Sequence, residues 1–268
     1  MTPPEVAKAK RAARPVRTVS PTAIRAIAVV IPARDEEELI GQCLRSVQVA
    51  VQYLQTARGT LAPPVTIIVV ADGCLDRTAS VARAFPGVRV VELESANVGA
   101  ARASGVDAAL ATRHVPEKRL WIANTDADSV VPRHWLSHQL ELADAGHDVM
   151  IGTVRPDFKD LTAAQIRAWR ATHKPGAANG HVHGANLGVR ASAYTRAGGY
   201  LSRAEHEDND LVDRLRETAA DLLATDRCEV VTSGRQVGRT PGGYAGYLRS
   251  QLLELASHTA AQQVTDAQ

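Results

Sequence analysis

Two aspartates stand where the sequence most clearly suggests chemistry. Asp126 and Asp128 follow the apolar run at 120–123 and are one residue apart. A buried strand ending there sets both carboxylates at the edge of a sheet, where they can hold a divalent cation against a phosphate-bearing ligand. Taken alone, the pair could equally cap the helix that follows.

Three other predicted strand ends carry polar residues of the same kind. Asp35 and Glu36 come after the run at 27–31, Asp72 after the run at 65–70, and Asn97 after the run at 88–93. The carboxyl ends of parallel strands meet at one edge of a sheet, and ligands gather there. We therefore expect these side chains to contribute to one ligand site together with the two aspartates.

An alternating pattern of strands and helices must position these residues. Residues 27–31 form an apolar, β-branched run, as in strands buried on both faces of a parallel sheet, and residues 65–70, 88–93 and 120–125 repeat the strand signal. Helical spacing of apolar residues lies between them, and the acidic residues 35–38 are expected to open the first helix at the positive end of its dipole. The pattern predicts an α/β fold with a mostly parallel central sheet.

The pattern is looser after residue 130. Asp208 belongs to an acidic cluster that is expected to begin a helix at 205–216, where it could also be a charged first turn. The other expected elements are helices at 135–145 and 163–172 and strands at 149–154, 184–189 and 228–233.

Charge and composition exclude several classes of protein. The 268 residues have a net charge of +2, but residues 1–25 hold six bases and one acid. Removing these from the totals of 31 bases and 29 acids leaves 25 bases and 28 acids, a net charge of −3. A mildly acidic body argues against nucleic-acid binding. We expect residues 1–25 to be a disordered basic leader. Weak peripheral attachment of this leader to an anionic membrane is an alternative that the sequence leaves open.

The cysteines and the apolar runs indicate a cytoplasmic protein without a membrane span. Cys43, Cys74 and Cys228 are odd in number and form no CxxC pair, so neither a disulfide framework nor a zinc site is indicated. The spacing of the histidines at 181, 183 and 206 also lacks the pattern of a zinc site. Membrane spans need about 20 consecutive apolar residues, and the sequence contains no such run.

Six segments taken together resemble family 2 glycosyltransferases of the GT-A fold. They are IPARDEE at 31–37, VVADGCLDRT at 69–78, ANVGAARASG at 96–105, NTDAD at 124–128, HGANLGVR at 183–190, and AGGY followed by HEDNDLVDRL at 206–215. Each is weak alone, but they occur in the family's order over about residues 27–216. The resemblance implies a Rossmann-like sheet flanked by helices, with a smaller region on the acceptor side.

The resemblance also implies domain limits. A single glycosyltransferase domain is expected at 26–250, with a nucleotide-sugar-binding half at 26–130 and an acceptor-binding half at 131–250. Residues 251–268 would be the end of a helix or a tail.

The family's site residues can be carried onto this sequence by motif position. The residues implied to contact the nucleotide sugar are Pro32, Asp35, Glu36, Asp72, Asn97, Gly99, Arg102 and Asp126. Asp72 matches the second of the family's usual pair of base-contacting aspartates, whereas Ala71 replaces the first. Asp128 matches the metal ligand of the DxD motif, and Asp208 the base of inverting members. Donor or acceptor sugar contacts fall on Gly184, Ala185, Asn186 and Glu207.

The implied cofactor is Mg²⁺ or Mn²⁺, and the implied donor is a UDP, GDP or dTDP sugar that gives its sugar to a hydroxyl acceptor. A metal that spreads charge over the leaving diphosphate favours this reaction, and a carboxylate such as Asp208 can activate the acceptor. Many relatives have a late histidine as a further metal ligand, but residues 217–250 contain no histidine. Arg235 and Arg239 could instead grip the diphosphate, or simply belong to a basic surface loop.

Two rival functions use similar parts. A nucleotidyltransferase also combines an α/β sheet, a metal and paired aspartates, but it would need a basic triphosphate grip where residues 33–38 read ARDEEE. A non-catalytic relative that binds nucleotide sugars would keep the donor site without turnover. A nicotinamide dehydrogenase is disfavoured because no GxGxxG follows the first predicted strand.

Overall fold

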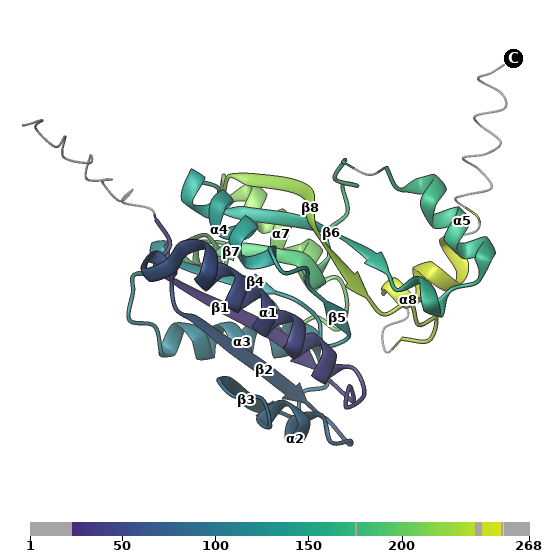
Figure 1. Cartoon of the computed structure of the whole chain (residues 1–268), viewed down its shortest axis with the longest axis horizontal. Coiled ribbons are helices and arrows are strands. Elements are labelled where there is room, and N and C mark those ends of the chain that lie inside the picture. The colour runs from purple at the N-terminus through teal and green to yellow at the C-terminus, as the bar shows by residue number, and fades with distance from the viewer. Residues whose placement is uncertain (1–22, 175, 239–242, 253, 255–268) are drawn as a thin grey trace, which may run out of the picture.

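The computed structural model describes residues 23–174, 176–238, 243–252 and 254. Eight strands form one sheet in the order β3-β2-β1-β4-β7-β6-β8-β5 (Figure 1). The strands are β1 (Ala26–Ala33), β2 (Val65–Asp72), β3 (Val88–Leu93), β4 (Leu120–Asn124), β5 (Ser129–Val130), β6 (Val149–Pro156), β7 (Leu187–Arg190) and β8 (Leu222–Thr232). The helices are α1 (Ile40–Arg58), α2 (Thr78–Arg83), α3 (Val98–Ala111), α4 (Trp135–Ala145), α5 (Ala163–Thr172), α6 (Ala191–Arg196), α7 (Glu207–Glu217) and α8 (Tyr244–Gly246).

The first four strands are parallel, as the sequence predicts, and the sheet becomes mixed beyond them. β1 pairs in parallel with β2 and β4, and β2 with β3. β7 then runs antiparallel to both β4 and β6, while β6 and β8 are parallel. The short β5 pairs antiparallel with β8 and was not expected from the sequence. This pairing matters because it sets the end of β8 beside the turn that carries Asp128.

Helices cover both faces of the sheet and enclose two apolar cores. One core contains the buried faces of α1 and α4, and the other contains those of α3, α6 and α7. In α1 the buried residues recur every three or four positions, at Ile40, Cys43, Leu44, Val47, Ala50 and Leu54. β1 is buried over Ile27–Ile31, which explains why its sequence does not alternate with polar residues.

A smaller apolar cluster lies beside the far ends of β6 and β8. It joins Trp169 of α5 to Leu248 and Leu252, with Phe158 and Tyr244 packed against it. Figure 1 shows α5 and α8 together at this side of the molecule, away from α1, α2 and β3. Among the described residues, no helix combines the length and apolar character that a membrane crossing requires.

The starts of α1 and β8 differ from those expected. α1 begins at Ile40, so the acidic residues 35–38 form a turn before the helix, and Asp35 has a φ of 47° there. β8 begins six residues before Cys228, because residues 222–225 also pair with β6. The basic residues 1–22 and most of 251–268 lie outside the described residues.

Candidate active site

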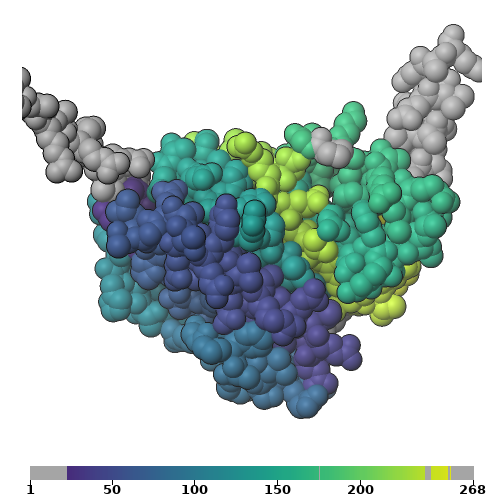
Figure 2. Space-filling model, in the orientation of Figure 1, coloured from purple at the N-terminus to yellow at the C-terminus, as the bar shows by residue number. Residues whose placement is uncertain are grey.

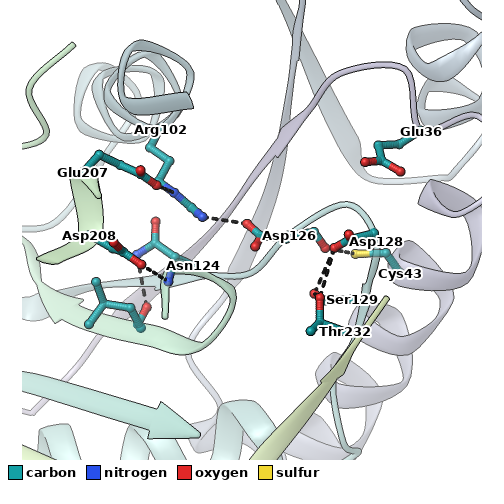
Figure 3. Close-up of polar contacts among 12 residues, drawn as sticks. Glu36, Cys43, Arg102, Asn124, Asp126, Asp128, Ser129, Glu207, Asp208 and Thr232 are labelled. Carbon is teal, nitrogen blue, oxygen red and sulfur yellow. Dashed lines mark hydrogen bonds and ion pairs between the residues drawn. The ribbon is translucent and has the colours of Figure 1, made fainter. Parts of the chain in front are cut away.

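Several of the sequence-predicted residues meet around the turn that follows β4. Asp126 and Asp128 lie on this turn, Glu36 reaches it from the end of β1, and Arg102 reaches it from α3. Figure 3 shows Glu207 and Asp208, at the start of α7, on the side of Asp126 that faces away from Asp128. The strand order places the ends of β1 and β4 next to each other, because these two strands are paired.

One buried arginine joins the turn to α7. Arg102 is 2% exposed; its Nη2 donates to Asp126 Oδ1 at 2.6 Å and its Nε to Glu207 Oε1 at 2.9 Å (Figure 3). Gly184 makes room for this side chain, because a Cβ there would lie 2.3 Å from Arg102 Nη2. Burial raises the pKa of Glu207, and the charge of Arg102 opposes that rise. Arg102 is thus a buried link between the strand-end carboxylate and α7.

A second arginine joins Asp128 to Glu36. Arg235, in the segment after β8, donates from Nη1 to Glu36 Oε2 at 3.1 Å and from Nη2 to Glu36 Oε1 at 2.7 Å. The same Nη2 lies 2.9 Å from Asp128 Oδ2. The side chain of Glu36 is 5% exposed, so this fork–fork pair compensates a buried charge. Two chain segments 199 positions apart therefore meet at the turn after β4.

Asp128 is a buried carboxylate that hydroxyl groups and an arginine surround. Its Oδ1 accepts hydrogen bonds from Thr232 Oγ1 at 3.2 Å and Ser129 Oγ at 3.3 Å (Figure 3). Burial and then the charge of Asp126 raise its pKa to about 6, although Arg235 opposes the rise. A carboxylate that has lost hydration and is only partly compensated is one that a bound cation would stabilise. Thr232 was not predicted, because only the β5–β8 pairing brings it here.

Cys43 is a further residue whose role the sequence does not indicate. It lies on the buried face of α1, and its thiol Sγ donates to the carbonyl oxygen of Asp126 at 3.2 Å. Burial raises the pKa of this thiol, so it stays protonated and can remain a donor. Cys43 therefore helps to hold the turn that carries both aspartates.

Asp208 opens α7 and is half-buried. Its Oδ2 accepts a hydrogen bond from the backbone N–H of Gly184 at 2.7 Å, and its Oδ1 from that of Asn209 at 2.8 Å. His183 precedes Gly184, and burial lowers its pKa to about 4, although the charge of Asp208 opposes that change. His183 is consequently neutral at pH 7. In the sequence, only the position of His183 in the HGAN motif at 183–186 indicated a role for it. In the structure this motif contacts Asp208 through Gly184.

Asp72 and Asn97 organise a loop. The carboxylate of Asp72 accepts the backbone N–H groups of Ser95, Ala96 and Asn97 and the Ser95 hydroxyl, at 2.7–2.9 Å. Burial alone would raise its pKa, but these bonds lower it. Asn97 Oδ1 caps α3 by accepting from Ala100 N at 3.0 Å. In this structure both side chains bind the protein itself, and their contact with a nucleotide base stays a prediction.

Two glycines and a buried asparagine act through packing. Gly99 lies under the 201–203 segment, and a Cβ there would be 2.1 Å from the Leu201 carbonyl oxygen. Asn186 corrects an expectation: its side chain is fully buried and bonds to Trp135 Nε1 and to the carbonyl oxygens of Thr153 and Cys228, each at 2.9 Å. A saturated, buried amide cannot face a sugar, so Asn186 ties α4 to β6 and β8. Its neighbours Gly184 and Ala185 are also buried.

A pocket of about 270 Å³ opens beside Arg235. Its lining residues come from the turn after β1, the turn after β2 and the segment after β8, and they are Asp35, Glu36, Glu37, Glu38, Leu39, Asp76 and Arg235. Asp35 Oδ1 accepts from Leu75 N at 2.7 Å, which joins the two turns. Pro32 is half-buried in β1, just before this pocket. Arg239 lies outside the described residues.

The donor set suits a hard divalent ion at Asp128. Mg²⁺ is usually held by one or two protein carboxylates together with substrate phosphates, and Asp128 supplies one such carboxylate. The two arginine networks together hold four carboxylates and only two guanidinium groups, an excess of negative charge that a divalent ion would balance.

A second group of candidate ligands is less suitable. Ligand atoms of Asp35, Cys74 and Asp76 lie within 4.8 Å of one another. Both carboxylates already accept backbone N–H groups, and burial raises the pKa of the Cys74 thiol, which disfavours the thiolate that binds metals.

Comparisons with known proteins give the fold and a family. The model of a family described as glycosyl transferase family 2 matches residues 28–194. Crystallised S. aureus TarS 1–349 in complex with UDP has a TM-score of 0.56 and 12% identity, covering 87% of this chain and 68% of that one. The mannosyltransferase PcManGT from Pyrobaculum calidifontis, in complex with GDP-Man and Mn²⁺, has a TM-score of 0.54 and 18% identity, covering 90% and 75%.

A third solved structure is similar over most of both chains. Glucosyl-3-phosphoglycerate synthase from Mycobacterium tuberculosis, in complex with Mg²⁺ and UDP, has a TM-score of 0.53 and 17% identity, covering 91% of this chain and 85% of that one. The chain spans 65% of TarS 1–349 in a second structure, whose name includes no UDP, and 39% of the chain in a structure of TarS. No curated protein matches this sequence. At these identities the likeness concerns the fold, and it confirms the α/β, GT-A-type architecture expected from the sequence.

Proposed function

The chain belongs to glycosyl transferase family 2, and from that premise we propose that it moves a sugar from a nucleoside diphosphate sugar to a hydroxyl acceptor with inversion at the anomeric carbon. Membership of the family supports glycosyl transfer as the reaction. The donor, the metal and the stereochemistry are the parts that we propose.

The link through Arg102 is the observation that carries the proposal. By binding Asp126 and Glu207 together, Arg102 sets the start of α7 against the turn after β4. Asp208 follows Glu207 directly in the sequence. The candidate base therefore lies near the same link that holds Asp126, on the side of it formed by α7. Transfer between two substrates needs this arrangement, with a charged donor site and a separate carboxylate facing the acceptor.

The donor would place its diphosphate at Asp128. Similar structures contain UDP with Mg²⁺ or GDP-Man with Mn²⁺, which supports a nucleoside diphosphate sugar and a divalent ion as the ligands. Such an ion, held by Asp128, would supply the positive charge that stabilises the departing diphosphate. The acidic pocket beside Arg235 and the loop ordered by Asp72 are the surfaces left for the nucleoside.

Asp208 would act on the acceptor. Its carboxylate accepts the hydroxyl proton while the hydroxyl oxygen forms its bond to the anomeric carbon, and the bond from that carbon to the diphosphate oxygen breaks with its electron pair. A single displacement inverts the anomeric centre and needs no protein nucleophile. The bond from Gly184 N to Asp208 Oδ2 orients the carboxylate and leaves Oδ2 one lone pair that can accept the hydroxyl proton, whereas Oδ1 already accepts two hydrogen bonds from Asn209.

The test separates binding of the donor from transfer. A thermal-shift panel of UDP, GDP and dTDP sugars with and without Mn²⁺ identifies the donor, and release of its nucleoside diphosphate is then measured with a mixture of small hydroxyl acceptors. Asp208→Asn should leave the Kd of the donor within twofold and slow transfer by about 10²–10⁴-fold. Asp213→Asn, on the exposed side of the same helix, is the matched control and should behave as the wild type.

Two results would contradict the proposal in different ways. Normal transfer by Asp208→Asn would move the base elsewhere. Failure of every nucleotide sugar to stabilise the wild-type protein would remove the donor assignment itself.

A further inference from the structure

Arg235 occupies the position at which the proposed metal would need to bind. Of the two oxygens of Asp128, Oδ1 accepts from Thr232 and Ser129, and Oδ2 faces Arg235 Nη2 at 2.9 Å. A cation bound to Oδ2 would lie within a few ångströms of this guanidinium group, and the two positive charges would repel. A metal ion on Asp128 Oδ2 and Arg235 in its present position therefore exclude each other.

Contacts of the neighbouring residues restrain the chain on both sides of Arg235. Gly234 N donates to Asp160 Oδ2 at 2.9 Å, and a Cβ on Gly234 would lie 2.6 Å from the carbonyl oxygen of Asp157. Gln236 Nε2 donates to Gln165 Oε1 at 3.2 Å on the other side. The Arg235 side chain itself is 35% exposed, and it lines the acidic pocket.

Glu36 determines how far the guanidinium group can move. Both Nη atoms of Arg235 bind Glu36, whereas only Nη2 binds Asp128. Each Nη carries two hydrogens, so Nη2 can release Asp128 and keep Glu36. The hydrogen that is set free would then point into the site rather than into solvent.

We propose that Arg235 is the resident cation of the donor site and that it exchanges partners when the donor binds. Without donor, Arg235 compensates both Glu36 and Asp128. When a nucleoside diphosphate arrives with its metal, Nη2 gives up Asp128 Oδ2 to the metal and donates to a diphosphate oxygen, while its pair with Glu36 remains. A guanidinium fork suits this double role because it can bind two anions at once.

The exchange makes metal and nucleotide bind cooperatively. A metal ion that binds without nucleotide must displace the Arg235 guanidinium from Asp128, and Arg235 then gains no new partner. The metal therefore binds weakly on its own. Metal together with diphosphate gives Arg235 an anion in return, so each ligand raises the affinity of the other. This inference rests on the proposed function, since it needs a metal at Asp128 and a diphosphate beside it.

The experiment measures Mn²⁺ and nucleotide binding rather than turnover. Calorimetry and Mn²⁺ paramagnetic resonance on the full chain compare the wild type, Arg235→Gln and Arg77→Gln. Arg77 pairs with Glu37 near the same pocket but is 81% exposed, so Arg77→Gln removes the same charge without touching Asp128. The nucleotide probe is UDP or GDP, whichever binds the wild type.

Arg235→Gln should bind free Mn²⁺ at least tenfold more tightly than the wild type, and nucleotide in saturating Mn²⁺ at least tenfold more weakly. Arg77→Gln should match the wild type within twofold in both titrations. If loss of the partner of Glu36 prevents Arg235→Gln from folding, Arg235→Lys keeps a cation there. It should retain weak Mn²⁺ binding and lose nucleotide affinity, because an ammonium group lacks the fork.

Opposite results overturn the inference. Unchanged or weaker binding of free Mn²⁺ by Arg235→Gln would show that Arg235 does not compete with the metal, and unchanged nucleotide affinity would remove its diphosphate role. In both cases metal and nucleotide still bind the wild type together, so the proposed function survives. Absence of Mn²⁺ binding in every protein, with nucleotide and without, would instead overturn the metal assignment and the inference with it.

Discussion

Replacing Asp128 by asparagine should stabilise the folded protein at neutral pH while it removes the metal ligand. The pKa of Asp128 rises from 3.8 to about 6 because the carboxylate is buried and lies near Asp126. A difference of about two pKa units corresponds to about 3 kcal/mol of unfolding free energy at about 1.36 kcal/mol per unit. The side chain is only 13% exposed, so solvent screens little of this cost.

The neighbours of Asp128 should tolerate the change. Asparagine keeps an oxygen that can accept hydrogen bonds from Thr232 and Ser129. Arg235 keeps its two hydrogen bonds to Glu36, so the buried charges of this pair still compensate each other. We therefore expect Asp128→Asn to gain about 1–3 kcal/mol at pH 7.5. For a protein of this size, about 2–4 °C of Tm accompanies each kcal/mol.

The pH dependence follows from the sign of the shift. At pH 7.5 Asp128 is ionised in the folded and unfolded states, and the folded state carries the cost of burying the charge. As the pH falls through about 6, the folded state takes up a proton that the unfolded state takes up only near 3.8, so the cost disappears. The advantage of Asp128→Asn should be full above pH 6 and vanish near pH 4.

Urea unfolding at pH 7.5 and 4.5, with EDTA to exclude metal, measures this difference. Asp213→Asn is the control because the side chain of Asp213 is 68% exposed. A variant that is less stable than the wild type at pH 7.5, by an amount independent of pH, would refute the reasoning. It would mean that the ion pair with Arg235 outweighs the cost of burial.

Three further changes test other parts of the structure. Arg102→Gln should lower the free energy of unfolding by about 3–5 kcal/mol, because it leaves two carboxylates without their buried arginine. Arg113 belongs to a partly exposed ion pair, so Arg113→Gln should lower it by less than about 1 kcal/mol in the same urea titration. Gly99→Ala should lower the Tm because its Cβ meets a carbonyl oxygen, and Gly41→Ala in α1, where a Cβ meets only side chains, should not. Asp72→Asn should lower stability at pH 7, and its difference from the wild type should shrink as acid protonates Asp72, whose folded pKa is depressed; a constant difference down to pH 2 would contradict this.

The sequence predicted the half of the site that depends on strand ends. Buried runs of β-branched residues locate β1, β2 and β4, and parallel pairing then requires that Glu36, Asp72, Asp126 and Asp128 follow their strands at one edge. These inferences succeed because each uses only local pattern and a general rule of sheet topology. The same reasoning cannot give the start of α1, where a turn with positive φ at Asp35 replaces the expected first turn.

The partners of the site residues could not be predicted, because they come from distant segments. Arg102 meets Glu207 across 105 positions, and Arg235 meets Glu36 across 199. The pairing of β5 with β8 brings Thr232 to Asp128, yet β5 has only two residues and no pattern of its own. Motif position likewise suggested a sugar contact for Asn186, whereas the structure shows a buried amide that holds strands and helix together.

We propose that Asp128 holds a divalent ion against the diphosphate of a nucleotide sugar. Calorimetric titration of UDP and GDP into the wild type and Asp128→Ala, each with and without Mn²⁺, measures whether it does. At least one nucleotide should bind the wild type with an affinity that depends on Mn²⁺, and this dependence should be lost in Asp128→Ala. Equal affinity in all four titrations of the nucleotide that binds would contradict it.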